Sequence, residues 1–549
     1  MRLPKIRTVA FLIKIARENY FLTPQLDRLR AHFAKAGSAH RLSGAPTVLI
    51  QCVEDYFYFA LFGKIAAGLR ACGSIRVDQY CPRSLRQNSS LSLRQFFWNS
   101  IGQNWLSDWK WRRLYGAFTD RAVYRATGWV FPWTALRLWW TAWRLWRGLR
   151  NVDELAQLRV MDIWIGDLVI DSYIRFKPAP TPAVNDPYLL IVIRQALKDI
   201  YKADQYFRRN RPAMLLTSYT TYIQHGVAAR VAVRRGIPVR AFSNLQDFAT
   251  EITCNDVWHT RDGKAYKKDF FMLPDQAGKI ASAEKQLNNR MAGRIDAATS
   301  YMKASAYGRT DGAEFDVKGM PVIFLHDFYD SVHVYRWITF HDFWTWVCFT
   351  IDTLQAAEIP FAIKPHPNQV TGSSDIIDRL LAKYPNLILV PSGVANDQLA
   401  KGGMACAITV YGTVASEMAF MGIPTVSCGD NPHISFDFCR TARTSEEYAK
   451  LLLDCRSLPA VPIEMHRESC IFYYMHNLHL APEEEQLKDK MTELRRRIFF
   501  VESTPSPQEI IDAASEFASG PALQAFCASL YGLIRDRAGQ AGEDTVNRA

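Results

Sequence analysis

Paired cysteine motifs, long apolar runs and a surplus of acidic residues are all missing from this sequence of 549 residues. Its eleven cysteines are scattered and form no CxxC pair, which argues against a disulfide framework or a zinc site and favours reduced thiols in a cytosolic setting. No run of about 18 apolar residues occurs, so no membrane-spanning helix is predicted. The apolar stretch TVAFLIKIA near the N-terminus is interrupted by Lys14, and we expect a basic amphipathic segment there and not a signal peptide.

The length and composition predict more than one folded domain. Hydrophobic residues make up 48% of the chain and charged residues 22%, as in soluble proteins, and the chain is too long for a single core. In the first half, strands are predicted at 47–53, 74–80, 213–216 and 237–242, with helices between the members of each pair. We therefore predict a basic lead-in over 1–45 and a Rossmann-like domain over 46–315.

The second half alternates strands and helices more regularly. Strands are predicted at 321–326, 360–364, 387–390, 405–410 and 424–428. This pattern predicts a Rossmann-like domain over 316–480, with a parallel sheet that binds its ligand at the carboxyl ends of the strands. Charged helices are expected over 481–549. The predicted fold class is α/β, with two Rossmann-like domains in the glycosyltransferase B (GT-B) arrangement and a substrate cleft between them.

A helical insertion rich in tryptophan and arginine, at 85–160, interrupts the first half. Ten of the fifteen tryptophans lie between 98 and 150, and nine basic residues between 101 and 150 accompany only two acidic ones. On a helix, one sector would carry Trp139, Trp140, Trp143 and Trp146, overlapped by Arg144, Arg147 and Arg150. This pattern is typical of the headgroup layer of an anionic membrane. Packing of the tryptophans into the core is an equal alternative, and no motif supports a nucleic-acid surface.

The stretch TVYGTVASEMAFMGIPTV, at 409–426, predicts a strand, a tight turn and a helix. Gly412 allows the turn, and Thr413 can cap the helix, whose free N–H groups would face a phosphate. Glu417, one turn further on, is placed to accept hydrogen bonds from a ribose. The alternative is an ordinary turn whose small residues only serve packing.

The stretch FAIKPHP, at 361–367, ends a predicted strand of the same sheet in a rigid corner. Pro365 and Pro367 fix φ on both sides of His366, so this loop loses little entropy when it binds a ligand. Lys364 and His366 offer cationic donors for a nucleotide phosphate. A rigid turn without a ligand is the alternative, but two such motifs at the strand ends of one sheet favour a function.

Histidines and acidic residues are dense after the strand at 321–326. The group comprises His326, Asp327, Asp330, His333, His341 and Asp342. His326 and His333 could be metal ligands, but neither HExxH nor a facial triad is present, so we predict no metal and no cofactor besides a nucleotide-sugar substrate. We favour a loop that supplies acid–base and sugar-binding groups, with His326 and Asp330 as catalytic candidates, over ordinary surface polarity.

Several of these motifs, in this order, resemble a known group of proteins. They are FLHDFYDSVH, FHDFWTW, IKPHP and VYGTVASEMAFMGIPTVSCGD, all within 321–430. Together they resemble the bacterial capsule and surface-polysaccharide biosynthesis proteins of GT-B type, and they are similar to capsular Kdo transferases and CDP-glycerol glycerophosphotransferases. WIGDLVIDSYIRF and TSYTTYIQHGVAARVAVRRGIPV fit the same group more weakly. The segment 98–150 matches no motif of the group.

The resemblance implies roles for individual residues. Lys364 and His366 would contact the donor phosphates, Gly412, Thr413 and Ser416 would form the phosphate-facing turn, and Glu417 would hold the ribose. A base must also take the proton of the acceptor hydroxyl. We rank Asp167 first for this role, with a helix or turn cap as its alternative. The other candidates are Asp171, Glu54, Asp55 and His225.

The sequence therefore predicts a glycosyltransferase that transfers a sugar from a nucleotide-activated donor to a growing or lipid-linked surface or capsular polysaccharide. We expect it in the cytoplasm, peripheral on the inner membrane and attached to the anionic surface through segment 98–150, without a nucleic-acid partner. Three alternatives stay open: a CDP-polyol phosphotransferase, a sugar-nucleotide 2-epimerase and a non-catalytic assembly factor.

Overall fold

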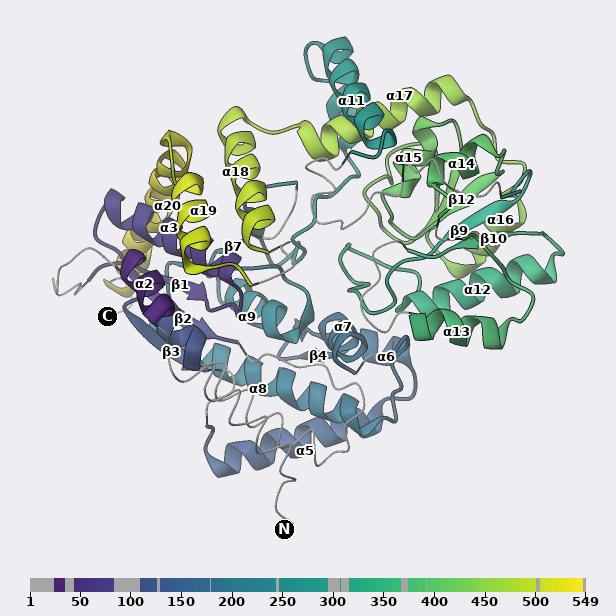
Figure 1. Cartoon of the computed structure of the whole chain (residues 1–549). Helices are drawn as coiled ribbons and strands as arrows, with labels where there is room; N and C mark the ends of the chain where they lie inside the picture. The colour runs from purple at the N-terminus through teal and green to yellow at the C-terminus, as the bar shows by residue number, and fades with distance from the viewer. Residues whose placement is uncertain are drawn as a thin grey trace. The chain divides into compact units, whose positions relative to one another are not determined.

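The structure, a computed structural model, describes residues 24–34, 44–82, 109–125, 129–177, 179–242, 246–294, 307, 315–366, 374–391, 393–499 and 504–546. The chain divides into two compact units (Figure 1). Unit 1 consists of Met1–Ser172, Val184–His259 and Ala481–Ala549, and unit 2 of Tyr173–Ala183 and Thr260–Leu480. The division falls within helix α7 (Gly166–Phe176). Each unit is described by itself.

Unit 1 is built on a six-stranded sheet in the order β3-β2-β1-β6-β7-β8. Its strands are β1 (Thr47–Gln51), β2 (Arg76–Cys81), β3 (Arg121–Arg125), β6 (Met214–Thr217), β7 (Val239–Ala241) and β8 (Thr250–Ile252), and the short β4 (Arg159–Val160) and β5 (Ile163–Trp164) form a separate hairpin. All neighbours in the large sheet pair in parallel except β8, which runs antiparallel to β7. The central strand β1 is buried along its whole length, as a strand covered on both faces must be.

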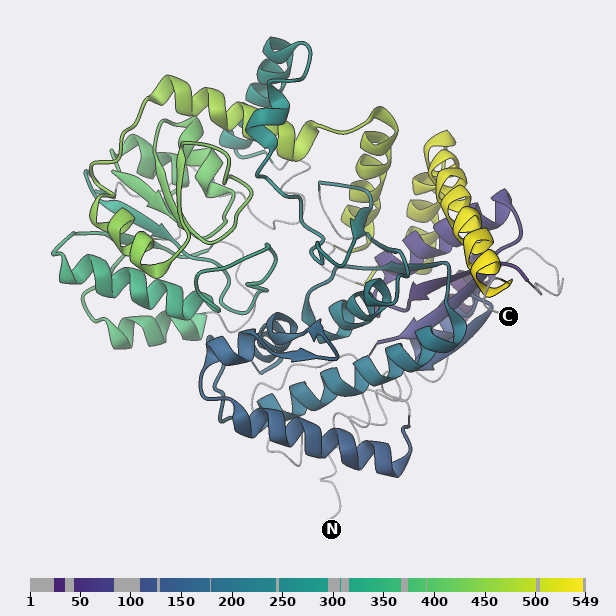
Figure 2. The ribbon, with the colours of Figure 1, turned by 180° about the vertical axis from the view of Figure 1, so that it is seen from behind.

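Helices cover both faces of this sheet (Figure 2). The helices of this unit besides α7 are α2 (Pro24–His32), α3 (Tyr56–Cys72), α5 (Pro132–Gly148), α6 (Val152–Ala156), α8 (Pro187–Asn210), α9 (Tyr222–Arg234), α18 (Pro482–Ile498), α19 (Pro507–Phe517) and α20 (Pro521–Val546). Val48 and Ile50, alternate residues of β1, belong to a core with α3, α19 and α20. Helices near the end of the chain therefore pack in the same core as its first strand. Helices α8 and α9 pack together on the other face, and α5 packs on α8.

Unit 2 is built on a six-stranded, fully parallel sheet in the order β11-β10-β9-β12-β13-β14. The strands are β9 (Pro321–Phe324), β10 (Ala362–Lys364), β11 (Ile388–Leu389), β12 (Cys406–Ile408), β13 (Thr425–Cys428) and β14 (Cys439–Ala442). When the strands are numbered within this unit, the order is 3-2-1-4-5-6, which is that of a doubly wound Rossmann sheet.

The helices of unit 2 are α10 (Tyr266–Phe270), α11 (Gln276–Met291), α12 (Phe343–Ala356), α13 (Ser374–Lys383), α14 (Asn396–Lys401), α15 (Val414–Phe420), α16 (Ser445–Leu453), α17 (Pro462–Tyr473) and the π-helical turn η2 (Tyr474–Leu478). Residues of β9, β10 and β12 form one core with α14 and α15. A second core joins α10, α15 and α17, and α11 packs against α17 and η2.

The predicted fold class is confirmed: both units are α/β with Rossmann-like sheets. All five strands predicted in the second half are present, and so are the four predicted around β1 and β6. The sequence does not predict the edge strands β3, β8 and β14, which are short and polar, or the hairpin of β4 and β5.

No single helix in the described parts of the chain is both long and apolar enough to cross a membrane. Helix α19 and the first part of α20 are long and apolar enough only when they are taken together, and they are bent by 74° at the break between them. Most apolar residues of this pair belong to or pack against the core with α3.

Candidate functional site

The carboxyl ends of β9 and β12 form the switch point of the unit 2 sheet. From β9 the chain continues to β10 and β11 on one side, and β12 is followed by β13 and β14 on the other. The loops after β9 and β12 therefore diverge, and it is at such a point that open α/β sheets bind their substrates. The motifs predicted from the sequence lie on these loops and at the end of β10.

His326 is the side chain that joins the two sides of the switch point. It follows β9, and its Nε2 lies 3.1 Å from Thr409 Oγ1 and accepts the N–H of Val410 at 3.4 Å. Its ring stacks on Phe343 at 4.7 Å. Burial, together with the neighbouring His366, lowers the pKa of His326 to about 3. The imidazole is thus neutral at physiological pH, with its Nε2 lone pair directed at the β12 loop.

Gly412 packs closely on the residues around this histidine. A Cβ on Gly412 would lie 2.9 Å from Thr409 Oγ1 and 3.5 Å from His326 Cε1. The turn therefore packs directly on the His326–Thr409 contact. Thr413 begins α15 without a capping hydrogen bond from its side chain, and its exposed hydroxyl instead accepts Arg290 Nη2 at 3.2 Å. The predicted cap is absent, although the predicted turn is present.

Ser416 and Glu417 are both buried within α15. The Ser416 hydroxyl donates to the carbonyl of Thr413 at 3.0 Å. Glu417 Oε1 lies 2.5 Å from Arg290 Nη2, and the Tyr307 hydroxyl donates to Glu417 Oε2. The sequence gives no signal for Arg290 or Tyr307, because both come from a polar region far from the motif. Glu417 thus anchors α15 to α11, and its role toward a ribose stays a prediction.

Lys364 ends β10 and is buried. Its ammonium donates to the carbonyl of Pro391 at 3.0 Å and to that of Val394. It therefore braces the loop that follows β11, and its positive charge lies at the carboxyl end of β10. His366, two residues further on, is half-buried. Pro367, the second proline of the rigid corner, lies outside the described residues.

The loop after β9 carries the other predicted acid–base groups. Asp330 is exposed and accepts the N–H of Ser331 at 2.9 Å, whereas His333 is buried and stacks on His341 at 5.7 Å. Within the described ranges, no group of three or more His, Cys, Asp or Glu side chains is arranged to hold a metal ion. Of the predicted catalytic residues in this unit, only Asp330 has an exposed side chain.

His433, in the loop after β13, was not predicted from the sequence. It is fully buried, its ring packs 4.2 Å from that of Phe472, and neither ring nitrogen has a hydrogen-bond partner among the residues that the structure describes. Burial lowers the pKa of His433 to about 3. Its neutral ring is part of the aromatic core below the loop, and the sequence marks it only as one histidine among twelve.

The switch point of the unit 1 sheet lies between β1 and β6, as that of unit 2 lies between β9 and β12. Gln51 is the last residue of β1 and lies at this point. It is fully buried. Its Oε1 accepts the Thr217 hydroxyl at 2.8 Å and the N–H and hydroxyl of Ser218 at 2.9 and 2.7 Å. Its Nε2 lies 2.9 Å from His225 Nδ1. Sequence reasoning missed this residue, although a polar residue at the end of the apolar strand TVLIQ is a usable signal.

This network fixes the tautomer of His225. The backbone N–H of Ser218 can only donate, so the group that accepts it must be the Gln51 oxygen, and the Gln51 amide nitrogen then donates to His225 Nδ1. The proton of the neutral ring is therefore on Nε2. Burial, with a contribution from His259, lowers the pKa of His225 to about 3. His225 is arranged as a hydrogen-bond donor, and this does not suit it to act as a base through Nε2.

The backbone next to this histidine is strained. Tyr222 begins α9 with φ of 59°, a left-handed conformation that is unfavourable for a bulky residue. The next N–H, of Ile223, donates to the Ser172 hydroxyl at 2.9 Å, and Gly226 lies so close to Thr220 O that a Cβ would be 2.4 Å away. Strain of this kind is concentrated at functional sites, and here it lies at the switch point of the sheet.

Asp167 and Asp171 lie one turn apart on α7, and both are buried. Both oxygens of Asp167 accept from Arg230 of α9, one of them at 2.6 Å, and Arg230 also donates to the Trp164 carbonyl at 2.7 Å. Asp167 therefore fixes α7 against α9. Asp55 caps α3 by accepting the N–H of Phe57 at 2.7 Å, and burial raises its pKa. A catalytic role for these carboxylates stays a prediction.

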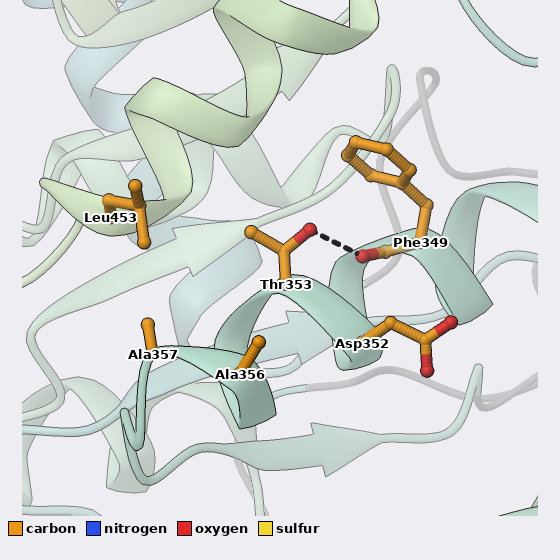
Figure 3. A pocket seen from close by; sticks show the side chains of 6 residues that line it. All are labelled: Phe349, Asp352, Thr353, Ala356, Ala357 and Leu453. Atoms are coloured by element: carbon orange, nitrogen blue, oxygen red, sulfur yellow. Dashed lines mark hydrogen bonds between the residues drawn. The ribbon is translucent and has the colours of Figure 1, made fainter.

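A hollow of about 470 Å³ lies elsewhere on unit 2 (Figure 3). It is lined by Phe349, Asp352, Thr353, Ala356, Ala357 and Leu453. The last turns of α12 form most of it, and since α12 runs back from the end of β9 to the start of β10, these turns lie beside the amino ends of the strands. The Thr353 hydroxyl donates within the helix, to Phe349 O at 2.8 Å. None of the predicted site residues lines this hollow.

The buried pair of Arg290 and Glu417 yields a prediction about stability. Arg290→Met leaves the Glu417 charge buried without its cation, so we expect a loss of about 3–5 kcal/mol in the free energy of unfolding, measured with urea. The double variant Arg290→Met/Glu417→Gln keeps the bond to Tyr307 without the charge and should recover most of the loss. Equal stability of Arg290→Met and the wild type would show that the pair does not anchor α15.

No family model matches the sequence, and no curated protein matches it. Among solved structures, GT-B glycosyltransferases are similar to this chain. KpsC of Thermosulfurimonas dismutans, a beta-Kdo 2,4 transferase, is 12% identical, covers 47% of this chain and 80% of its own, and has a TM-score of 0.28. The O-GlcNAc transferase of Thermobaculum terrenum is 11% identical over 93% of this chain and 79% of its own, with a TM-score of 0.26.

The UDP-GlcNAc 2-epimerase of Methanocaldococcus jannaschii, solved with UDP-GlcNAc and UDP, is also similar. It is 10% identical over 77% of this chain and 96% of its own, with a TM-score of 0.26. Likenesses of this size add nothing to the argument from the site. Thus the chain has two Rossmann-like units and is similar, at low identity, to glycosyltransferases and to enzymes that act on sugar nucleotides.

Proposed function

We propose that this protein is a glycosyltransferase that transfers a sugar from a nucleotide-activated donor to a growing or lipid-linked surface or capsular polysaccharide. The observation that supports it is the convergence of His326, Lys364, His366 and the turn at Gly412 on the carboxyl ends of adjacent strands of one parallel sheet. This edge is where doubly wound sheets bind nucleotides. The motif resemblance supplies the reaction class.

The donor phosphates bind, in this proposal, at the end of β10. Lys364 is held in place by two carbonyl groups, so its charge is preorganised and needs no rearrangement when a diphosphate binds. His366, half-buried on the adjacent loop, donates to the same phosphate. The Gly412 turn follows β12, on the far side of β9 from β10, and its backbone faces the same phosphates in this proposal.

The proton of the acceptor hydroxyl passes to Asp330. During transfer, the hydroxyl oxygen forms a bond to the anomeric carbon, the bond from that carbon to the phosphate oxygen breaks, and the hydroxyl proton must be taken by a base. A base needs an accessible lone pair. Both oxygens of Asp167 accept from Arg230, and His326 directs its lone pair at the β12 loop, whereas the Asp330 carboxylate is exposed. His326 then acts as a positioning residue.

Unit 1 binds the acceptor. Its switch point offers polar groups suited to a sugar, namely the Gln51 network and the Nε2–H of His225, which can donate to a hydroxyl oxygen. A lipid-linked acceptor would require the enzyme to work as a peripheral protein on the inner membrane, from the cytoplasmic side.

Nucleotide binding tests the proposal. We expect one member of a panel of CMP, CDP, UDP and GDP to raise the melting temperature of the wild type, and the affinity for it to fall at least about tenfold in His366→Ala, because a charge-assisted hydrogen bond contributes about 1.5–3 kcal/mol. Lys401→Ala is the matched control, since this exposed lysine lies at the opposite edge of the unit 2 sheet. If no nucleotide shifts the wild type, or His366→Ala binds equally well, the donor site is not where we place it.

The role of Asp330 predicts a separate effect on chemistry. With the nucleotide sugar that the panel identifies, we expect Asp330→Asn to release nucleotide product at least about 100-fold more slowly, because the amide cannot accept the proton. Donor affinity should change little. Glu358→Gln, another exposed carboxylate of unit 2, should turn over like the wild type. A transfer rate in Asp330→Asn within threefold of the wild type would require a different base.

A further inference from the structure

Helix α5 exposes a face that is both aromatic and cationic. We call the α5 face the outer residues Trp133, Leu136, Arg137, Trp140, Trp143, Arg144 and Arg147, with Trp129 and Phe131 just before the helix. Trp133 is 74% exposed, Trp140 56% and Trp143 49%, and Trp129 reaches 86%. Single exposed apolar residues are common, but a contiguous row of large ones marks an interaction site.

Helix α5 is packed against the protein on its other side, so only one face of it is exposed. Ala142 is fully buried, and Leu138 and Leu145 are half-buried on the side that packs against α8. Elsewhere in the insertion, Trp111 lies in the unit 1 core, 4.9 Å from Tyr56. The insertion therefore divides into a segment whose tryptophan completes the core and a helix that turns most of its tryptophans outward. Of the α5 tryptophans only Trp146 is half-buried, so core packing, the alternative left open by the sequence, does not describe the α5 face.

The charge of the α5 face is all of one sign. Helix α5 has no acidic residue, and Arg137, Arg144 and Arg147 are all exposed. Arg144 lies 5.0 Å from the centre of the Trp140 ring. Arginine stacked on tryptophan keeps its guanidinium edge available for an anion while its face covers the aromatic ring. The α5 face thus presents cations and indole rings side by side.

We infer that the α5 face docks on an anionic phospholipid bilayer, with α5 lying in the plane of the headgroups. Indole rings are amphipathic and settle at the headgroup level, and arginines beside them pair with lipid phosphates. The helix has 17 residues, about 25 Å, which provides a long line of contact in the membrane plane. Its arginines exclude it from the bilayer centre, so it would lie on the membrane and not span it.

Charge complementarity favours this occupant over a second copy of the chain. Two copies meeting through the α5 face in an antiparallel arrangement would bring arginines against arginines, with no acidic residue of α5 to offset them. An anionic membrane offers phosphates to the arginines and acyl chains to Leu136 and Phe131. This inference does not depend on the proposed transfer reaction, because none of the predicted site residues belongs to the α5 face.

Flotation of the full chain with vesicles tests the inference. We expect the wild type to float with vesicles of phosphatidylcholine and phosphatidylglycerol and to bind at least tenfold more weakly to phosphatidylcholine alone. Trp140→Ala/Trp143→Ala and Arg144→Gln/Arg147→Gln should each lower the apparent affinity for the anionic vesicles at least tenfold. The matched control is Met272→Ser/Ile463→Ser, which removes two large exposed side chains from unit 2 and should float like the wild type. Because all these residues are exposed, their thermal unfolding should match that of the wild type.

Three results would overturn the inference. The first is a wild type that does not float, and the second is equal flotation of the wild type and Trp140→Ala/Trp143→Ala. The third is a wild-type dimer, seen by light scattering and lost in the tryptophan variant, without vesicle binding, which would assign the α5 face to a second copy. Nucleotide binding measured in the same variants separates this question from the donor site: flotation through α5 without nucleotide binding would refute only the proposed function.

Discussion

Parallel pairing of strands is the constraint on which the candidate sites depend. When all strands of a sheet point the same way, every loop that follows a strand emerges at the same edge, so residues far apart in the sequence meet there without any contact designed for the purpose. In unit 2 this brings the loops after β9, β10 and β12 together, and His326 then contacts Thr409 directly. In unit 1 it places Gln51 beside Thr217 and Ser218. Both clusters lie where the strand order reverses.

Many of the charged groups near these edges are used to hold elements in place. Arg230 fixes α7 to α9 through Asp167, Arg290 fixes α15 to α11 through Glu417, and Lys364 braces the loop after β11. A buried carboxylate is costly unless it is paired, and Asp167 and Glu417 are paired within their units. In the proposed mechanism the chemistry is left to exposed groups such as Asp330, whereas Asp167, the carboxylate ranked first from the sequence, is buried.

The sequence was informative about periodic structure and less so about partners. Apolar runs bounded by glycine and proline located the central strands of both sheets, because burial on both faces demands such runs. The motifs that follow these strands lie at their carboxyl ends, as predicted, for the same reason. The partners of Glu417 and His225 could not be predicted, since Arg290, Tyr307 and Gln51 reach them only through tertiary packing. The edge strands β3 and β14 were not predicted, because a strand at the edge of a sheet needs no apolar run.

The central claim is that a nucleotide-activated donor binds at the carboxyl ends of β9, β10 and β12. Hydrogen–deuterium exchange of the full chain, with and without the nucleotide that binds it, tests this claim most directly. The account predicts slower exchange in peptides covering 325–333, 362–366 and 409–416, with little change around the hollow at the end of α12. Slower exchange confined to that hollow, or none in unit 2, would contradict it.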